Sequence, residues 1–205
     1  MGYAEPVPWI ESFAARTGLR YEPDADERWL RAWEPYTTLR VAIGYAHALQ
    51  ATGEAGSISI ARMTVAGPPR PSPTGGPPEE TEARCWIAIV QDSRLQGKAA
   101  TTSDMGGIFG EPFDLIGYPR RMTGDPVFDR VFGTFAADPA ELEKALTPSL
   151  RKLLIGWQTP VHAEVRPGGF VLAPVALAAD PTSLTWLLDA VRAFGNKAAK
   201  IPTRA

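Results

Sequence analysis

The chain has 205 residues, of which 44% are hydrophobic and 21% charged, and its 21 basic and 23 acidic residues leave a net charge of −2. This composition supports a packed core and excludes intrinsic disorder of the whole chain. It also lacks the basic excess of nucleic-acid-binding proteins, so no nucleic-acid partner is expected. The 20 prolines interrupt every long segment, which excludes a coiled coil, and no run of about 20 apolar residues exists that could span a membrane.

Two helices are expected at the start of the chain. The segment 8–18 places a proline at the first helical position and a glycine where a left-handed cap ends the helix. A capping-box-like pattern at 24–27 begins a second helix, which carries Trp29 and Trp33 and ends at Pro35.

Two strands should follow. Apolar residues at every second position predict strands over 39–51 and 57–65, with the residues 53–56 as a hairpin loop between them. The apolar face changes in the middle of 57–65, which indicates a β-bulge near Ala61.

A proline-rich segment separates these strands from the next. Residues 66–83 hold six prolines and three glycines, and we expect a disordered surface loop that makes no strand ladder. The prolines of 68–71 also suit a polyproline ligand, a less favoured interpretation. The segment 85–90 is apolar on both faces, which predicts a central strand paired with 57–65, and 98–104 is a further strand.

The last 80 residues have the clearest pattern. Asp-Pro and Thr-Pro pairs predict helix starts at 126, 139, 148 and 181. Strands are predicted at 134–137, 160–166 and 169–177. The last helix should end at Gly195, followed by a flexible tail over 196–205.

Together these elements predict one α+β domain over residues 1–205. An antiparallel sheet of five to seven strands would pack one face against helices. Two subdomains that divide near residue 105 are the alternative.

Catalytic chemistry has little support in the sequence. The two histidines, His47 and His162, fall in predicted strands without zinc-like spacing, so no metal and no cofactor are expected. Cys85 lies in an apolar strand, where a thiol is inert. We therefore assign no catalytic residue; a cysteine nucleophile with a histidine base is the weaker alternative. The glycine-rich segment 106–110 and the pair Asp125 and Asp129 are interpreted as structural.

The cysteine content and residues 1–8 indicate the cellular compartment. A single cysteine excludes an internal disulfide and favours a reducing environment. Residues 1–8 lack the basic and apolar regions of a signal peptide. A cytoplasmic protein is therefore expected.

Two side-chain groups are candidates for binding. Tyr118, Arg120 and Arg121 could hold a carboxylate or phosphate, because guanidinium groups bind such anions in a bidentate manner. Trp29 and Trp33 would form a partner surface if they are exposed together.

The order of elements resembles a loose group of uncharacterised bacterial proteins common in actinobacteria. The resemblance covers most of 9–195, with a Gly-Leu-Arg-Tyr-Glu-Pro segment at 18–23 and a Thr-Gly-Asp-x-x-Phe-Asp-x-x-Phe segment at 123–132. Members of that group often carry membrane spans. The resemblance implies this fold order and a non-enzymatic role, and it implies no functional residues.

The favoured function is a non-enzymatic binding module with an unidentified protein partner. A binder of small acidic ligands through the arginine pair and an enzyme of unfamiliar type are the alternatives. A homodimer is a further prediction, because a free sheet edge or the Trp-rich helix could pair two copies.

Overall fold

The computed structural model describes residues 4–34, 36, 39, 41–53, 56–67, 69–72, 75–103, 118–174 and 177–199. The helices are α1 (Pro8–Thr17), α2 (Glu27–Arg31), α3 (Pro126–Val131), α4 (Pro139–Ala145), α5 (Pro148–Gly156) and α6 (Pro181–Ala198). The strands are β1 (Arg20–Glu22), β2 (Ala42–Gly53), β3 (Gly56–Ala66), β4 (Glu82–Asp92), β5 (Ala99–Thr102), β6 (Arg120–Arg121), β7 (Gly133–Ala136), β8 (Val161–Arg166) and β9 (Gly169–Pro174).

All nine strands of the described chain join one antiparallel sheet in the order β1-β2-β3-β4-β9-β8-β5-β7-β6. This confirms the predicted single α+β domain with an antiparallel sheet, although the sheet is wider than the five to seven strands expected. Because β4 pairs with β9, the late hairpin of β8 and β9 lies in the middle of the sheet and joins the two halves of the chain. One sheet therefore runs through both halves of the described chain.

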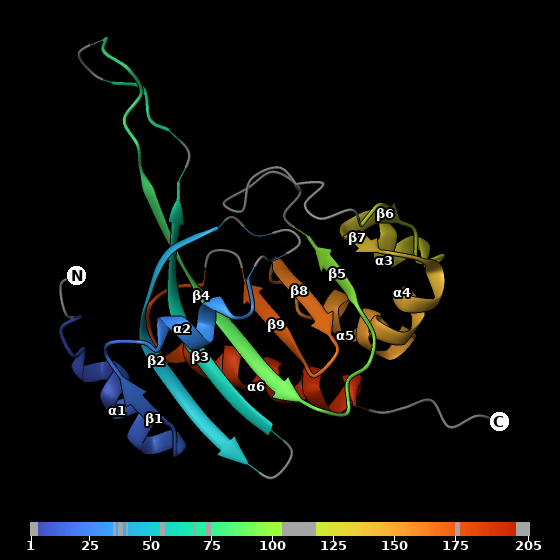
Figure 1. Ribbon diagram of the computed structural model, residues 1–205, viewed down its shortest axis with the longest axis horizontal. Coiled ribbons are helices and arrows are strands. Elements are labelled where there is room, and N and C mark those ends of the chain that lie inside the picture. The colour runs from blue at the N-terminus through green and yellow to red at the C-terminus, as the bar shows by residue number, and fades with distance from the viewer. Residues whose placement is uncertain are drawn as a thin grey trace.

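Helices cover both faces of the sheet, where the sequence predicted one covered face. One face packs against α1 and α3 to α6, and we call it the helix face. The other packs against Leu30 of α2 and the following Tyr36 and Leu39, and we call it the α2 face. In Figure 1, α2 lies in front of the strands and α6 behind them.

The strand β3 is buried on both faces, which explains its apolar pattern. Ile60 faces the helix-face core, whereas Ala61 and Met63 belong to the α2-face core. The strand pairs with β4 in unbroken register from Gly56 to Ala66, so the predicted bulge near Ala61 is wrong. The register shifts lie in the neighbouring β2 instead.

The proline-rich segment extends the β3–β4 hairpin away from the body of the protein (Figure 1). The amide of Gly67 donates to Thr81 O at 2.7 Å, and Arg70 and Glu79 exchange backbone hydrogen bonds of 3.0 and 2.8 Å. The prediction that this segment makes no ladder is therefore wrong for its described residues. The ladder forms because non-proline residues donate these bonds.

Most helix starts follow the predicted capping chemistry. The side chains of the residues before Pro126, Pro139, Pro148 and Pro181 accept backbone N–H groups of the first turn. In α2 the capping residue is Asp26, two residues later than expected, and its carboxylate accepts from Trp29 N.

The last helix continues past Gly195 to Ala198, so the predicted stop is wrong. A Cβ at Gly195 would lie 3.5 Å from the Phe170 ring, which is an ordinary contact distance, so the packing of α6 on the sheet does not require a glycine here. Residues 200–205 of the predicted tail lie outside the described residues. No helix in the described part of the chain is both long and apolar enough to cross a membrane.

Candidate functional site

The cysteine lies where its thiol is unreactive. Cys85 is 5% exposed on β4, and its Sγ lies 3.9 Å from Met63 O. Burial raises the pKa of this thiol to about 12, so the thiolate is scarce near neutral pH.

His162 belongs to a buried charged row on β8. Its Nε2 lies 3.5 Å from a carboxylate oxygen of Glu164, which in turn contacts Arg166 at 2.6 Å. Arg166 also donates to the carbonyl of Trp33 and lies 5.9 Å from the centre of the Tyr36 ring. This row ties the segment after α2 to the centre of the sheet, which is a structural role.

The arginine candidates do not converge. Arg120 pairs with Phe135 and Arg121 with Thr134 on β7, so the two successive side chains leave β6 on opposite faces. Arg121 donates to the carbonyl of Ala137 at 2.8 Å. Tyr118 instead lies against the Lys98 ammonium, with 4.8 Å between the nitrogen and the ring centre.

The remaining polar candidates have structural partners. Asp125 caps α3, and Asp129 accepts from the amides of Thr123 and Gly124. The glycine-rich segment 106–110 lies outside the described residues. Among the described residues, no three His, Cys, Asp or Glu side chains come together as a metal site.

The two tryptophans of the α2 region have different surroundings. Trp33 packs so closely on Gly169 that a Cβ there would overlap its ring. The ring centre of Trp29 lies 6.3 Å from that of Trp33. Trp29 is half-buried and lines a cleft. Of the two tryptophans, Trp29 is the one that lines this cleft.

The Trp29 cleft has a volume of about 180 Å³ and opens between α2 and the ends of β2 and β3. Its walls include Asp26, Trp29, Gln50 and Ser59. Ser59 is 3% exposed, and its hydroxyl has no hydrogen-bond partner among the described residues. No sequence pattern indicates this hydroxyl, because its burial depends on which face of β3 is covered by α2.

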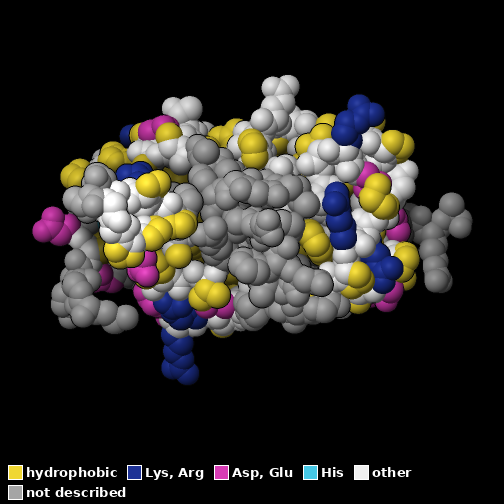
Figure 2. All heavy atoms as spheres, turned by 90° about the horizontal axis from the view of Figure 1, so that it is seen from above, with side chains coloured by type: hydrophobic (Ala, Val, Ile, Leu, Met, Phe, Trp, Pro, Cys, Tyr) yellow, Lys and Arg dark blue, Asp and Glu magenta, His cyan; other side chains and the backbone are white. Residues whose placement is uncertain are grey.

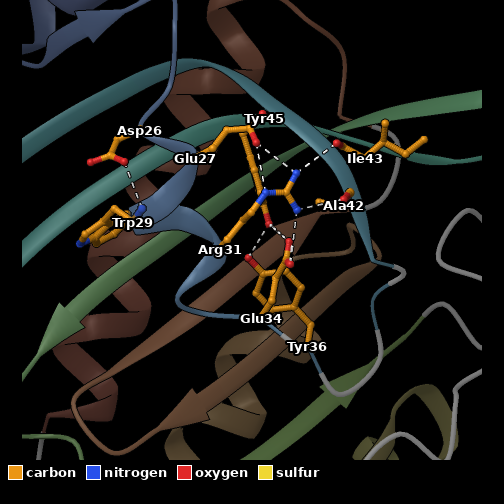
Figure 3. A network of polar contacts seen from close by, with 9 residues as sticks. All are labelled: Asp26, Glu27, Trp29, Arg31, Glu34, Tyr36, Ala42, Ile43 and Tyr45. Atoms are coloured by element: carbon orange, nitrogen blue, oxygen red, sulfur yellow. Dashed lines mark hydrogen bonds and ion pairs between the residues drawn. The ribbon is translucent and has the colours of Figure 1, made fainter. Parts of the chain in front are cut away.

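A polar network holds α2 in place beside the cleft (Figure 3). Arg31 donates to the carbonyls of Ala42 and Ile43, while Glu27 accepts from the amide of Tyr45 at 3.2 Å. The neighbouring strand β1 pairs only with residues 48–50 of β2. Arg31 and Glu27 form their hydrogen bonds with the earlier part of β2, which has no strand of the described chain beside it on this edge. The helix therefore replaces a neighbouring strand at this edge.

The network continues under α2. Tyr45 donates from its hydroxyl to Glu34 at 2.8 Å, and the hydroxyls of Tyr45 and Tyr36 lie 3.0 Å apart. Burial raises the pKa of both tyrosines, so they are neutral hydrogen-bonding groups. Trp29 is thus carried by a helix that directional bonds fix to the sheet.

A second cleft of about 410 Å³ lies on the helix face between α6 and the ends of β2 to β4. Ala51, Ile58 and Val191 supply apolar lining, and Asp92 and Arg94 form an ion pair of 2.6 Å at its edge. The hydrogen bond from Arg94 holds the pKa of Asp92 below its usual range.

His47 occupies a β-bulge in β2. The register shifts between Ala46 and Leu49, and His47 has a left-handed φ of 54° that non-glycine residues seldom adopt. Its Nδ1 lies 2.9 Å from the Tyr21 hydroxyl, and its amide donates to Pro23 O. The sequence alternation of β2 did not reveal this conformation.

The exposed large hydrophobic side chains of the described residues form two separate groups. Val41 and Ile43 lie at the start of β2, and Met122, Val127 and Val131 lie at α3. On the face seen in Figure 2, hydrophobic side chains of the described residues are spread among charged ones. Neither group is a large apolar surface.

The fold and clefts define an α+β protein with one antiparallel sheet between two helical layers. No family model and no curated protein matches the chain. Among solved structures, the chain is similar to the mycobacterial trehalose monomycolate transport factor A, TtfA, with a TM-score of 0.60 over 97% of each chain and 12% identity. At this identity the likeness shows the fold alone.

Proposed function

We propose that this protein is a non-enzymatic binding module that recognises one chemical group of its partner in the Trp29 cleft. The observation that carries this proposal is the Ser59 hydroxyl. Its residue is 3% exposed and lines the cleft, and the described part of the chain offers the hydroxyl no hydrogen-bond partner. A buried hydroxyl without a partner costs about 1–3 kcal/mol. A polar group of a ligand in the cleft would remove that cost.

The geometry of the reactive side chains supports binding without catalysis. A nucleophilic mechanism needs a nucleophile within hydrogen-bond reach of a base. In the described chain Cys85 contacts a backbone carbonyl, His47 contacts Tyr21, and His162 contacts Glu164. No contact joins the cysteine to either histidine in this part of the protein.

The size of the cleft limits what it can hold. Pockets for drug-sized ligands measure about 300–1,000 Å³, whereas the Trp29 cleft measures about 180 Å³. It therefore suits a single ring or side chain of a larger partner.

A sugar ring is the ligand group that we favour within this proposal. A sugar has hydroxyl groups at its edge and apolar faces, which suit the Asp26 carboxylate, the Ser59 hydroxyl and the Trp29 ring that line the cleft. The structural neighbour is named for the transport of a trehalose ester. This name suggests which sugar to test first.

The alternative acidic-ligand site at Arg120 and Arg121 has less support, because the two side chains leave β6 on opposite faces. The homodimer, the cytoplasmic location and the protein partner stay predictions. A light-scattering mass near the 22.1 kDa of one chain at high concentration would contradict the dimer.

Calorimetric titration with trehalose, with maltose as the comparison, tests the sugar. Binding should weaken about tenfold in Ser59→Ala, which removes one hydrogen bond, and further in Trp29→Ala. Val131→Ala, an exposed apolar substitution on α3, should leave binding unchanged. Equal binding by all three variants would contradict the cleft as the site.

Capture from the native cell tests the binding module when no sugar binds. A partner identified by mass spectrometry should be recovered with the unaltered protein and with Val131→Ala, and lost with Trp29→Ala. Turnover in a screen of esters, phosphates and amides, abolished by His47→Ala or His162→Ala, would instead establish an enzyme.

A further inference from the structure

A group of basic side chains lies on the helix face of β2 to β4, opposite the Trp29 cleft. Arg62 on β3 pairs with Trp86 on β4, and Thr64 two residues later pairs with Arg84. Cross-strand partners and residues two apart share a face of a sheet. Since Trp86 belongs to the helix-face core, Arg62 and Arg84 lie on that face as well.

The bulge in β2 brings His47 to the same face. Its ring stacks on Tyr21 with 6.2 Å between ring centres and 19° between planes. Tyr21 packs against the helix-face core, so the bulge directs His47 toward the two arginines. Uncommon left-handed backbone at a non-glycine residue is concentrated at functional sites.

The charges of this group are not balanced by acidic side chains. Arg62 lies over the Trp86 ring, 5.8 Å from its centre, and forms no ion pair with any described residue. Arg84 has one acidic contact, the exposed Glu82 at 3.8 Å. Two guanidinium groups therefore lie on the same face of the sheet, that of Arg62 half-buried and that of Arg84 exposed, and Glu82 is the one ion-pair partner among the described residues.

The ionisation of the group reflects this imbalance. Burial and then Arg84 lower the pKa of Arg62. Burial, Arg62 and Arg84 lower the pKa of His47, against a smaller opposite effect of Asp24. A bound anion would reverse the effect of the arginines on both groups.

We propose that Arg62, Arg84 and His47 bind a phosphate-type anion on the helix face of β2 to β4. Guanidinium groups offer paired N–H donors that match phosphate oxygens, and contact with the Trp86 ring limits the movement of Arg62. The anion is either a soluble phosphate ester or the headgroup of an anionic lipid. This site is independent of the Trp29 cleft and of the proposed function.

Nuclear magnetic resonance titration of the His47 ring tests the proposal directly. With inorganic phosphate at constant ionic strength, against chloride, the pKa of His47 should rise toward or above the ordinary histidine value of about 6.5. His162, which is fully buried on β8, is the internal reference and should not respond. An unchanged His47 pKa, or an equal response of both histidines, would overturn the proposal.

Substitutions identify the donors. Arg62→Gln and Arg84→Gln should each weaken phosphate binding about tenfold, because each removes a charge-assisted hydrogen bond. Arg28→Gln, the same charge change on the exposed side of α2, is the matched control and should have no effect. Equal weakening by all three would indicate only a general charge effect and would also overturn the proposal.

Two further arms distinguish the sources of the anion. Glycerol 1-phosphate represents a soluble ester, and vesicles of phosphatidylglycerol, with phosphatidylcholine vesicles as the comparison, represent a lipid surface. Binding in either arm that Arg62→Gln abolishes supports the site and identifies its source. Failure in both arms, together with no effect of inorganic phosphate, leaves the site without a ligand and refutes it.

Discussion

The two faces of the sheet are covered in different ways. On the helix face, five helices of the described chain, the longest of which is α6 with 18 residues, bury an apolar core in which the ring centres of Phe170 and Phe194 lie 4.7 Å apart. On the α2 face, a helix of five residues is held to β2 by hydrogen bonds of Arg31 and Glu27 with the backbone of that strand, and Tyr45 donates a further hydrogen bond to Glu34. A short helix buries too little area to be located by the hydrophobic effect alone, so directional bonds set its position.

This difference has a functional consequence. An apolar contact tolerates small shifts, whereas a hydrogen bond requires a defined geometry. The network under α2 therefore positions Trp29 beside Ser59.

Phe170→Ala should destabilise the protein by about 3–5 kcal/mol, because it leaves a cavity in the fully buried core of the helix face. Urea unfolding followed by circular dichroism measures this loss. A cost below about 1 kcal/mol would mean that the helix face is not the main source of stability.

Tyr45→Phe should cost about 1–3 kcal/mol, because it leaves Glu34 without the hydroxyl that donates to it in the buried network. It should also loosen α2, which changes the fluorescence of Trp29. Ligand binding in the Trp29 cleft should weaken together with stability. A variant with unchanged stability would show that the network does not locate α2.

Arg31→Ala should cost about 1 kcal/mol, since the ion pairs of Arg31 are partly exposed and two carbonyls of β2 lose their donor. The free edge of β2 should then pair with a second chain. Sedimentation at increasing concentration detects this association. Arg28→Ala is the control, and association of both variants would contradict the role of Arg31 as an edge cover.

Asp92→Asn tests the ion pair at the second cleft. The hydrogen bond from Arg94 lowers the folded-state pKa of Asp92 below its unfolded value. Its contribution is therefore complete above the ordinary value of about 3.9, and it is lost as the pH falls through the folded pKa. At pH 7 the free energy of unfolding of Asp92→Asn should be slightly below that of the unaltered protein, and this difference should disappear at pH 2. An equal difference at both pH values would contradict the contribution of the ion pair.

Helix starts could be predicted from the sequence because they depend on neighbouring residues. The capping Asp or Thr before Pro126, Pro139, Pro148 and Pro181 acts on the turn that follows it, so a few neighbouring residues are sufficient. The end of α6 was predicted wrongly because a glycine inside a helix costs only about 1 kcal/mol and does not by itself end it, and α6 continues through Gly195 to Ala198.

The candidate sites were harder to predict than the fold. Trp29 was recognised as a partner-surface candidate, but its difference from Trp33 depends on the packing of Gly169. The sequence pattern did not single out Ser59 or Arg62, because each lies within an ordinary strand pattern. Ser59 and Arg62 become candidates only in the folded protein, where the described residues around them supply no hydrogen-bond partner for Ser59 and no ion-pair partner for Arg62.

Local patterns in the amino-acid sequence predicted the fold class and most of the helix starts, because these depend on periodicity and on contacts between near neighbours. The tertiary structure decided that the sheet has nine strands, that both of its faces are covered, and where β2 bulges at His47. It also decided which side chains meet at the Trp29 cleft and beside Arg62. These features depend on register between strands that are distant in the chain, and no local pattern encodes that register.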